Sequence, residues 1–281
     1  MKVKIALIQM AMTDDLEDNL KKAVKLIRKA AKKGAQIVCL PEVFTSPYFP
    51  QEEKADTRKY EESIPGPSYH MLSKAAKDNN VILIGGSVYE NFNNRKFNSA
   101  MIFDETGTFL GKYRKMHIPH DPNFYEQNYF EKGDLGYQVF QTKFGKIAVL
   151  ICYDQWFPEA ARIVSLMGAD MIFYPTAIGT LDNVDQSEGN WQQAWEAVQR
   201  GHAIANGVIV AGVNRVGKES KTTFWGGSFI YSQFGTLLAR GKDKEKIIIA
   251  EVETELGKDV KEGWRFFYNR RPETYGKLTE R

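Results

Sequence analysis

Hydrophobic and polar residues along the chain form two patterns, one of strand length and one of helix length. Short apolar runs rich in Val and Ile are typical of strands, whereas apolar residues spaced three and four apart are typical of helices. The predicted strands are Val3–Gln9, Gln36–Leu40, Val81–Tyr89, Asn98–Phe103, Phe109–Lys112, Lys146–Ile151, Ala169–Tyr174, Val208–Val213 and Gly226–Tyr231. The predicted helices are Leu16–Lys33, Pro67–Asp78, Pro158–Met167 and Trp191–Asn206.

The second half of this pattern repeats the first. GAQIVCLPE at Gly34–Glu42 aligns with GADMIFYPT at Gly168–Thr176, and NNVILIGGSV at Asn79–Val88 aligns with NGVIVAGVNR at Asn206–Arg215. The strands that open the two halves also match, and so do two later turns that contain Gly-Thr. Blocks that match in the same order indicate an internal duplication.

The strands read as continuous apolar runs, which is typical of strands that are buried on both faces. Each half therefore forms a sheet with helices on one face, and the two remaining faces must cover each other. The predicted fold is an α/β four-layer αββα sandwich of two stacked sheets, built as a single domain over residues 1–281. Parallel strands of this kind place their chemistry at the carboxyl ends.

Composition narrows the function classes. The formal net charge of +3 is spread among interspersed acidic and basic residues, so neither nucleic acid nor an anionic membrane is an expected partner. No apolar run approaches the roughly 20 residues that a membrane-spanning helix needs. Residues 3–9 read as a strand rather than as the apolar core of a signal peptide. Two cysteines are too few for a disulfide framework, so the expected location is cytoplasmic.

Three polar residues at the ends of predicted strands can form a nucleophilic site. Cys152 ends the strand in KIAVLICYDQWFPEA, Glu42 follows a buried strand and a proline, and Lys115 lies in GKYRKMHIP. A thiol with its ordinary pKa is mostly protonated at neutral pH, and a neighbouring carboxylate can take its proton. A lysine and the backbone N–H of Tyr153 can then stabilise the oxyanion that forms when a carbonyl is attacked.

Each of these residues also has a purely structural explanation. Glu42 would be a surface acid, Lys115 one of 38 basic residues, and Cys152 a small apolar residue that ends a core strand. No spacing rule unites the three, because they lie far apart in the sequence.

Three segments resemble the conserved blocks of the nitrilase, or carbon–nitrogen hydrolase, superfamily. They are PEVF at Pro41–Phe44, GKYRKMHIP at Gly111–Pro119 and CYDQWFPEAAR at Cys152–Arg162. The resemblance implies that Glu42, Lys115 and Cys152 are catalytic. In FYEQNYFEKG it implies a second glutamate, Glu126, which supports the lysine and the substrate. It also implies the αββα fold and a homodimer or higher homo-oligomer.

The aromatic, arginine-rich tail at residues 262–281 is expected to lie in the interface between subunits. An exposed Trp264-Arg265-Phe266-Phe267-Tyr268 run would otherwise form a large apolar patch.

No cofactor and no metal are expected. The chain has no glycine-rich nucleotide-binding pattern. Its histidines are scattered, and Pro119 between His117 and His120 argues against a helical pair of metal ligands. A structural role for these two histidines is as consistent with the sequence as a place in the pocket. Cys39 lies inside the apolar run IVCL and is expected in the core.

Five segments carry a finer resemblance, namely HIPHDPNFYEQNYF, CYDQWFPEAAR, PTAIGT at Pro175–Thr180, QRGHAIANGV at Gln199–Val208 and NRVG at Asn214–Gly217. Within the superfamily they resemble the group that acts on N-carbamoylputrescine, a small carbamoyl amine. Relatives that act on carbamoyl amino acids carry an arginine shortly after the nucleophile, where this chain has Gln155-Trp156-Phe157. A substrate carboxylate would therefore lack a guanidinium partner. The residues expected to bind the substrate are Trp156, Thr176, Asp182, Asp185 and Glu188.

Several alternatives stay open at this point. The acidic loop after Thr180 is equally consistent with a solvent-exposed loop that binds no ligand. A second alternative is an amidase for another ureido compound or ω-amide, such as β-ureidopropionate. A protein of another class on the same scaffold would be a non-catalytic binding protein or a thiol redox sensor, although a sensor needs a resolving cysteine.

Overall fold

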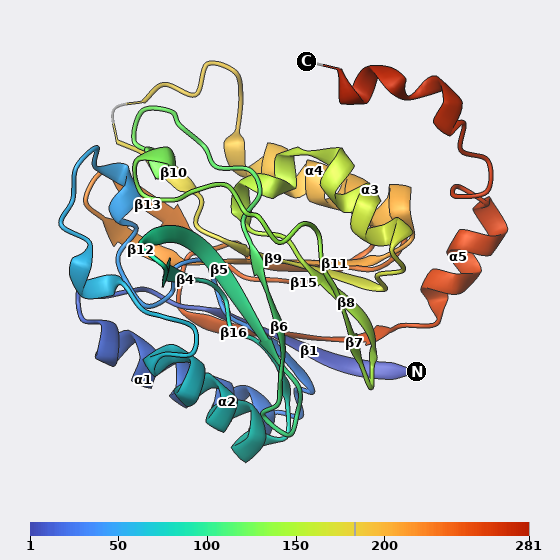
Figure 1. The fold of residues 1–281 in the computed structure, drawn as a ribbon. Helices are drawn as coiled ribbons and strands as arrows, with labels where there is room; N and C mark the ends of the chain where they lie inside the picture. The colour runs from blue at the N-terminus through green and yellow to red at the C-terminus, as the bar shows by residue number, and fades with distance from the viewer. Residues whose placement is uncertain (183, 281) are drawn as a thin grey trace.

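The computed structural model describes residues 1–182 and 184–280, and it confirms the predicted αββα sandwich. Two helices cover the outer face of one sheet and two cover the outer face of the other (Figure 1). The helices are α1 (Leu16–Lys32), α2 (Pro67–Asn79), α3 (Pro158–Leu166), α4 (Trp191–Asn206) and α5 (Leu256–Trp264). In the part of the chain described, no helix is both long and apolar enough to cross a membrane.

The strands form two large sheets and one small one. The first large sheet contains β1 (Lys2–Gln9), β2 (Ile37–Cys39), β3 (Ile82–Ile84), β4 (Val88–Phe92), β5 (Arg95–Phe103), β6 (Phe109–Arg114) and β16 (Lys246–Glu253). The second contains β7 (Val139–Thr142), β8 (Gly145–Val149), β9 (Met171–Thr176), β11 (Ile209–Asn214), β14 (Phe229–Tyr231) and β15 (Leu237–Arg240). The small sheet contains β10 (Gly179–Leu181), β12 (Val216–Glu219) and β13 (Thr222–Trp225).

The connectivity of the two large sheets confirms the internal duplication. In the first, β1, β2 and β3 are parallel neighbours, and β5 and β6 continue the sheet antiparallel. In the second, β8, β9 and β11 are parallel neighbours, and β14 and β15 continue it antiparallel. Each sheet also gains an antiparallel edge partner, β16 beside β1 and β7 beside β8. The repeated sequence blocks therefore fold into repeated units.

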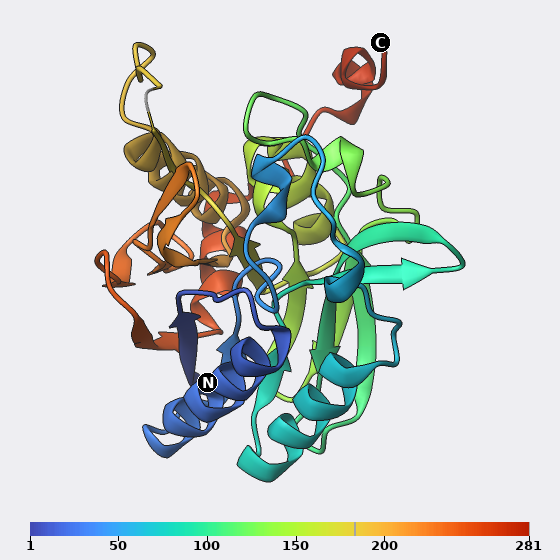
Figure 2. The same ribbon diagram turned by 90° about the vertical axis from the view of Figure 1, so that its left-hand side faces the viewer.

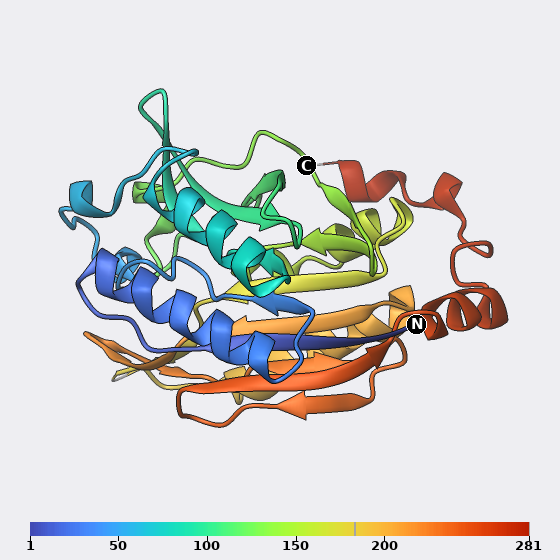
Figure 3. The ribbon, with the colours of Figure 1, turned by 90° about the horizontal axis from the view of Figure 1, so that it is seen from below.

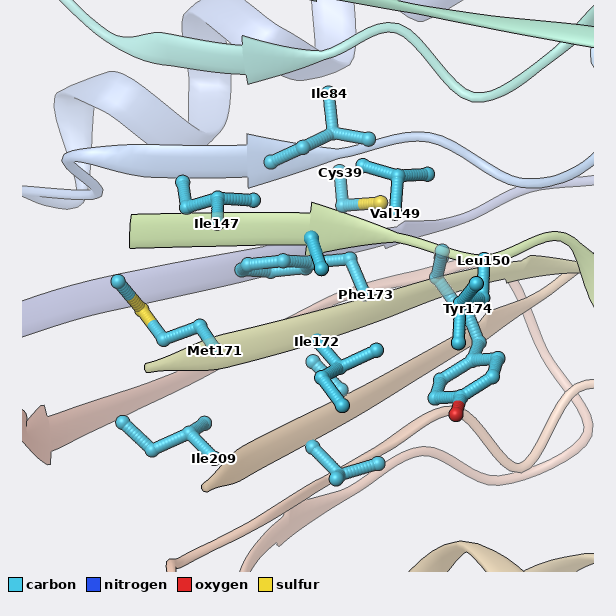
Figure 4. Packing of buried hydrophobic residues seen from close by; sticks show 14 of the residues in the cluster. Cys39, Ile84, Ile147, Val149, Leu150, Met171, Ile172, Phe173, Tyr174 and Ile209 are labelled. Atoms are coloured by element: carbon cyan, nitrogen blue, oxygen red, sulfur yellow. The ribbon is translucent and has the colours of Figure 1, made fainter. Parts of the chain in front are cut away.

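The inner faces of the two large sheets pack on each other and form the main core. Figure 4 shows Cys39 and Ile84 of the first sheet facing Ile147 and Val149 of the second. All four side chains are fully buried. Cys39 is therefore a core residue, as its apolar surroundings in the sequence predict.

The outer layer on the first sheet follows from the amphipathic pattern of α1. Asp15 caps this helix by accepting a hydrogen bond from the backbone N–H of Asp18 at 2.8 Å. Leu20, Ala23 and Ile27 are buried on the side that faces the sheet. Figure 3 shows α1 and α2 lying side by side over that sheet.

The single strand predicted over Val81–Tyr89 is wrong, because the chain breaks between β3 and β4. Gly86 adopts a left-handed backbone conformation with φ +60°, which other residues rarely adopt. A Cβ at this position would lie only 2.2 Å from the carbonyl oxygen of Pro41. The glycine thus lets the end of β3 approach the segment that carries Glu42.

The last part of the chain was not predicted in detail. β16 returns to pair with β1 along its whole length, from Lys2 opposite Glu253 to Gln9 opposite Lys246. Helix α5 and the residues after it run along the outside of the sandwich (red in Figures 1 and 2). Trp264 is 58% exposed and Tyr268 is 76% exposed, so the tail leaves large aromatic surfaces uncovered in a single copy.

Candidate active site

Cys152 lies at a sharp elbow between a strand and a helix. β8 ends at Val149, a short 3-10 helix runs from Cys152 to Trp156, and α3 begins at Pro158. Cys152 has φ +42°, a strained conformation for a residue with a side chain, and such strain is concentrated at functional sites. Tyr153 lies in the first turn of the 3-10 helix, where backbone N–H groups have no partner inside the helix.

Asp154 holds this elbow against the other half of the molecule. Its carboxylate is fully buried and accepts hydrogen bonds from the backbone N–H of Ile151 at 2.8 Å and from the Tyr113 hydroxyl at 2.8 Å. It also accepts the backbone N–H of His117 at 3.0 Å and lies 2.7 Å from that ring's Nδ1. His117 is thereby explained as a structural residue of the loop after Lys115.

The structure brings Glu42, Lys115 and Glu126 into direct contact. Lys115 Nζ donates to Glu42 Oε1 at 2.8 Å. It also lies 2.6 Å and 2.9 Å from the two carboxylate oxygens of Glu126. All three side chains are at most 1% exposed, so they form a buried triplet of one cation between two acids.

Two neighbours fix the acids further. Asn98 Nδ2 donates to Glu42 Oε1 at 2.8 Å, and the Tyr48 hydroxyl donates to Glu126 Oε1 at 2.7 Å. The second oxygen of Glu42, Oε2, is buried and has no hydrogen-bond partner within residues 1–182 and 184–280. A buried acceptor without a partner is costly, and here it is a carboxylate oxygen ready to accept a proton.

Cys152 lies close enough to this triplet for the charges to affect its ionisation. Burial raises the pKa of the thiol well above its ordinary value, and the Glu42 charge raises it further. The Lys115 cation lowers this pKa, but by less than the burial raises it. The resting thiol is therefore protonated at neutral pH, and it needs a base before it can act as a nucleophile.

The side chain of Lys115 stays protonated at neutral pH. Burial on its own would lower the pKa of this ammonium group, but the carboxylates of Glu126 and Glu42 outweigh burial and raise the pKa above its usual value. A permanently charged lysine beside the nucleophile is suited to stabilising an oxyanion.

A cavity of about 640 Å³ opens onto Cys152 and Glu126. Its walls are mostly apolar and aromatic, as is usual for small-molecule sites. Among the described residues that line it, the charged ones are Asp121, Glu126 and Glu188, all of them acidic. Both oxygens of Glu126 are engaged by Lys115, so Asp121 and Glu188 are the carboxylates left for a ligand.

In the structure, some of the predicted substrate-binding residues line the cavity and others do not. Trp156 and Glu188 line the cavity, and so does Tyr153. Asp182 is instead paired with Lys218 at the surface, and Asp185 is exposed. Neither of these acids is among the described lining residues.

Thr176 lies at the end of β9 and is fully buried. Its hydroxyl donates to the carbonyl oxygen of Tyr174 at 2.9 Å, and it is not among the described residues that line the cavity. A direct substrate contact for Thr176 stays a prediction.

Asp121 is the lining residue that the sequence analysis missed. It lies five residues before Glu126, in the segment HDPNFYEQ, so its position beside a predicted site residue was the available signal. The charge of Asp121 raises the pKa of Tyr153, although by less than burial does. Asp121 therefore lies near Tyr153, the residue after Cys152.

No group of three or more histidine, cysteine, aspartate or glutamate side chains within the described residues is arranged to hold a metal ion.

The carboxyl ends of the strands of this αββα sandwich thus bring together a buried cysteine, a buried lysine and two buried glutamates, an arrangement suited to hydrolysis by a thiol. The family model of the carbon-nitrogen hydrolases matches residues 4–262, and the chain belongs to this family. A carbon-nitrogen hydrolase from Helicobacter pylori G27 has the same fold, with a TM-score of 0.95, 38% identity and coverage of 100% of this chain and 99% of that one.

Three relatives show which substrates occur among similar sequences. An N-carbamoylputrescine amidase from Solanum lycopersicum is 42% identical, covering 97% of this chain and 93% of the relative. A citrullinase from Francisella tularensis is 33% identical, covering 99% of both chains. An omega-amidase from Xenopus tropicalis is 35% identical, covering 98% of this chain and 97% of the relative.

Proposed function

We propose that this enzyme hydrolyses N-carbamoylputrescine to putrescine, carbon dioxide and ammonia. The observation that carries the proposal is the charge of the cavity. Its described lining includes the carboxylates of Asp121 and Glu188 and no lysine, arginine or histidine. N-carbamoylputrescine ends in an ammonium group, whereas a carbamoyl amino acid ends in a carboxylate that would need a cation here. Similarity to the tomato N-carbamoylputrescine amidase supports the same substrate.

The reaction begins with proton transfer from the thiol. Glu42 Oε2 takes the proton of Cys152, and the sulfur attacks the carbamoyl carbon. The carbonyl oxygen becomes an oxyanion, which Lys115 Nζ and the backbone N–H of Tyr153 stabilise. Glu42 returns the proton to the departing nitrogen, the C–N bond to the terminal amide breaks, and ammonia leaves.

The second half of the reaction releases the amine. Glu42 accepts a proton from water, and the resulting hydroxide attacks the carbon bound to Cys152. The C–S bond breaks, the proton returns to sulfur, and a carbamic acid leaves. This acid decomposes to carbon dioxide and putrescine. No step of the proposed reaction uses a cofactor.

Glu126 has a supporting role in this scheme. Desolvation and the nearby Glu42 charge raise the pKa of Glu126, while Lys115 opposes the change. Glu126 lines the cavity, and its bonds to Lys115 and to the Tyr48 hydroxyl fix the position of the ammonium group that stabilises the oxyanion.

A comparison of substrate charge tests the proposal. We expect kcat/KM for N-carbamoylputrescine to exceed that for N-carbamoyl-β-alanine by at least about a hundredfold, because only the first gains a charge pair in the cavity. Ammonia release under matched conditions provides the measurement. A preference for N-carbamoyl-β-alanine would contradict the substrate proposal but leave the cysteine chemistry intact.

Two variants localise the charge recognition. Glu188→Gln and Asp121→Asn are each expected to raise KM for N-carbamoylputrescine and to spare its neutral analogue N-pentylurea. Asp182→Asn serves as the matched control, because this acid is paired with Lys218 at the surface. If Asp182→Asn impairs the cationic substrate as much as Glu188→Gln does, the acids of the loop act together and the cavity assignment is wrong.

The carboxylate-bearing alternative, β-ureidopropionate, lacks an obvious partner in this cavity. One arginine of the second half, Arg215, is fully buried and donates to Glu219 and to backbone carbonyls of the Glu42 segment. It is therefore not available to a ligand.

We also propose that residues 262–281 bind a second copy of this chain. The tail exposes Trp264, Tyr268 and Leu278, and the C-terminal end of α3 exposes Leu166 and Met167. The tail and α3 are neighbours, because the guanidinium carbon of Arg162 in α3 lies 5.1 Å from the ring centroid of Phe267. Apolar surfaces of this extent are usually covered in the functional assembly.

A truncation tests the role of the tail. A chain that ends at Gly263 is expected to sediment as a smaller species than the full-length protein in analytical ultracentrifugation. Leu256→Ser is the control, since Leu256 is an exposed apolar residue of α5 outside the tail. A full-length chain that is already monomeric at micromolar concentration would contradict the proposal.

A further inference from the structure

We propose that Arg215 is a positioning residue that holds Glu42 in the geometry needed for proton transfer. Arg215 follows β11 in the second half of the chain, whereas Glu42 follows β2 in the first half. The side chain of Arg215 is fully buried, an unusual place for a guanidinium group. The inference rests on the proposed role of Glu42 as the base.

The contacts of Arg215 concentrate on the segment that carries Glu42. Its Nη2 donates to three backbone carbonyl oxygens, those of Glu42 at 3.0 Å, Val43 at 2.8 Å and Ser46 at 3.1 Å. Its Nη1 lies 2.8 Å from both carboxylate oxygens of Glu219, which balances the buried charge. A single side chain therefore clamps the Glu42 segment of one half to the end of the other.

The clamped segment is strained and needs such a restraint. Val43, directly after Glu42, has φ +42°, which is unfavourable for a β-branched residue. Its backbone N–H donates to Ser87 Oγ at 2.9 Å, and its carbonyl is one of those held by Arg215. Strained backbone persists only where its surroundings determine it fully. Without the clamp, we expect the segment to relax and to move the Glu42 carboxylate.

Small movements of Glu42 matter because its two oxygens have different tasks. Oε1 is fixed by Asn98 and Lys115, and this arrangement leaves Oε2 free as the proton acceptor. A displacement of about 1 Å at a reacting group can cost about a hundredfold in rate. Lysine cannot replace Arg215 in this role, since its compact ammonium lacks the planar set of five donors.

A double-mutant cycle with Glu42 tests the inference. We expect Arg215→Lys to lower kcat for N-carbamoylputrescine by about a hundredfold, with KM changed by less than about threefold. In a Glu42→Gln background the same substitution should have no further effect, because it acts through the carboxylate that has already been removed. Leu72→Ala, on the buried face of α2, is the control for lost stability and should leave kcat unchanged.

A second readout is independent of the substrate. The Glu42 charge raises the pKa of the Cys152 thiol, so Glu42→Gln should move the pH midpoint of Cys152 alkylation by iodoacetamide to a lower pH. Arg215→Lys should move this midpoint in the same direction by a smaller amount. The double variant should coincide with Glu42→Gln.

The kinetic and alkylation results distinguish a positioning role of Arg215 from a purely structural one. A folded Arg215→Lys enzyme with wild-type kcat and an unchanged midpoint overturns the inference, as does a loss of kcat that persists undiminished in the Glu42→Gln background. Wild-type activity of Glu42→Gln itself would instead refute the proposed base. Should Arg215→Lys not fold, Glu219→Gln loosens the same clamp, and it must give a smaller change with the same dependence on Glu42.

Discussion

Replacing Cys152 with alanine is expected to abolish turnover while the protein stays folded. The substitution removes the nucleophile, and loss of such a residue typically lowers kcat by at least about 10,000-fold. Only the sulfur atom is lost, and the backbone of the elbow remains tied through the buried Asp154. Ammonia release measures the activity, and circular dichroism with thermal unfolding measures the fold.

Cys39→Ala is the matched control for this prediction. Both cysteines are buried, but Cys39 lies in the core between the two sheets (Figure 4), whereas Cys152 lines the cavity. The Cys39 variant should lose stability and keep its kcat. Substantial turnover by a folded Cys152→Ala protein would refute the nucleophile, and a folded but inactive Cys39→Ala protein would implicate the other thiol.

Lys115→Met is expected to be nearly as severe, and for two separate reasons. Loss of one oxyanion donor typically costs about 3 kcal/mol of transition-state stabilisation, or at least about a hundredfold in rate. The substitution also leaves Glu42 and Glu126 as buried acids without their cation, which typically costs about 3–5 kcal/mol of folding free energy. Steady-state kinetics and chemical denaturation measure the two effects.

The pH dependence of stability separates these effects further. Burial and the Glu42 charge raise the pKa of Glu126 to about 7, and Lys115 opposes this rise, so the loss of Lys115 should raise this folded-state pKa further above that of the unfolded chain. Such a group destabilises the folded state above its unfolded pKa, so the deficit relative to wild type should shrink as the pH falls toward about 4.

Lys112→Met is the control, because Lys112 of β6 also pairs with a buried acid, Glu90 of β4, and neither residue is among the described residues that line the cavity. We expect this variant to lose stability without a comparable loss of kcat. If both variants lose activity to the same degree, the effect of Lys115 reflects general destabilisation rather than catalysis.

Local sequence patterns were sufficient to predict the repeated units and the turn between strand and helix at Cys152. The apolar run that ends at Cys152 and the Pro158 that opens α3 are both local signals, and each was interpreted correctly. The matched blocks around Glu42 and Thr176 likewise predicted equivalent strands, β2 and β9. Features of this kind depend on residues that are close in sequence.

Features that depend on distant residues were harder to predict. The strand break at Gly86 accompanies the close approach of the Pro41 carbonyl, and no local sequence pattern predicts that contact. The pairing of β16 with β1 joins the two ends of the chain. The clamp by Arg215 joins the two halves.

The substrate-binding residues show the same limit. The loop after Thr180 has no periodicity, so its sequence does not reveal which acids face the cavity. In the structure Glu188 lines it, Asp182 turns to Lys218, and Asp121 reaches it from a different loop. Only the three-dimensional arrangement distinguishes these acids.

The most direct test of this account compares ammonia release from N-carbamoylputrescine, citrulline and an ω-amide such as succinamate by the purified wild-type enzyme. We expect the highest kcat/KM for N-carbamoylputrescine, with release of putrescine in equal amount and loss of all activity in Cys152→Ala. A higher kcat/KM for citrulline or for the ω-amide would contradict the proposed substrate.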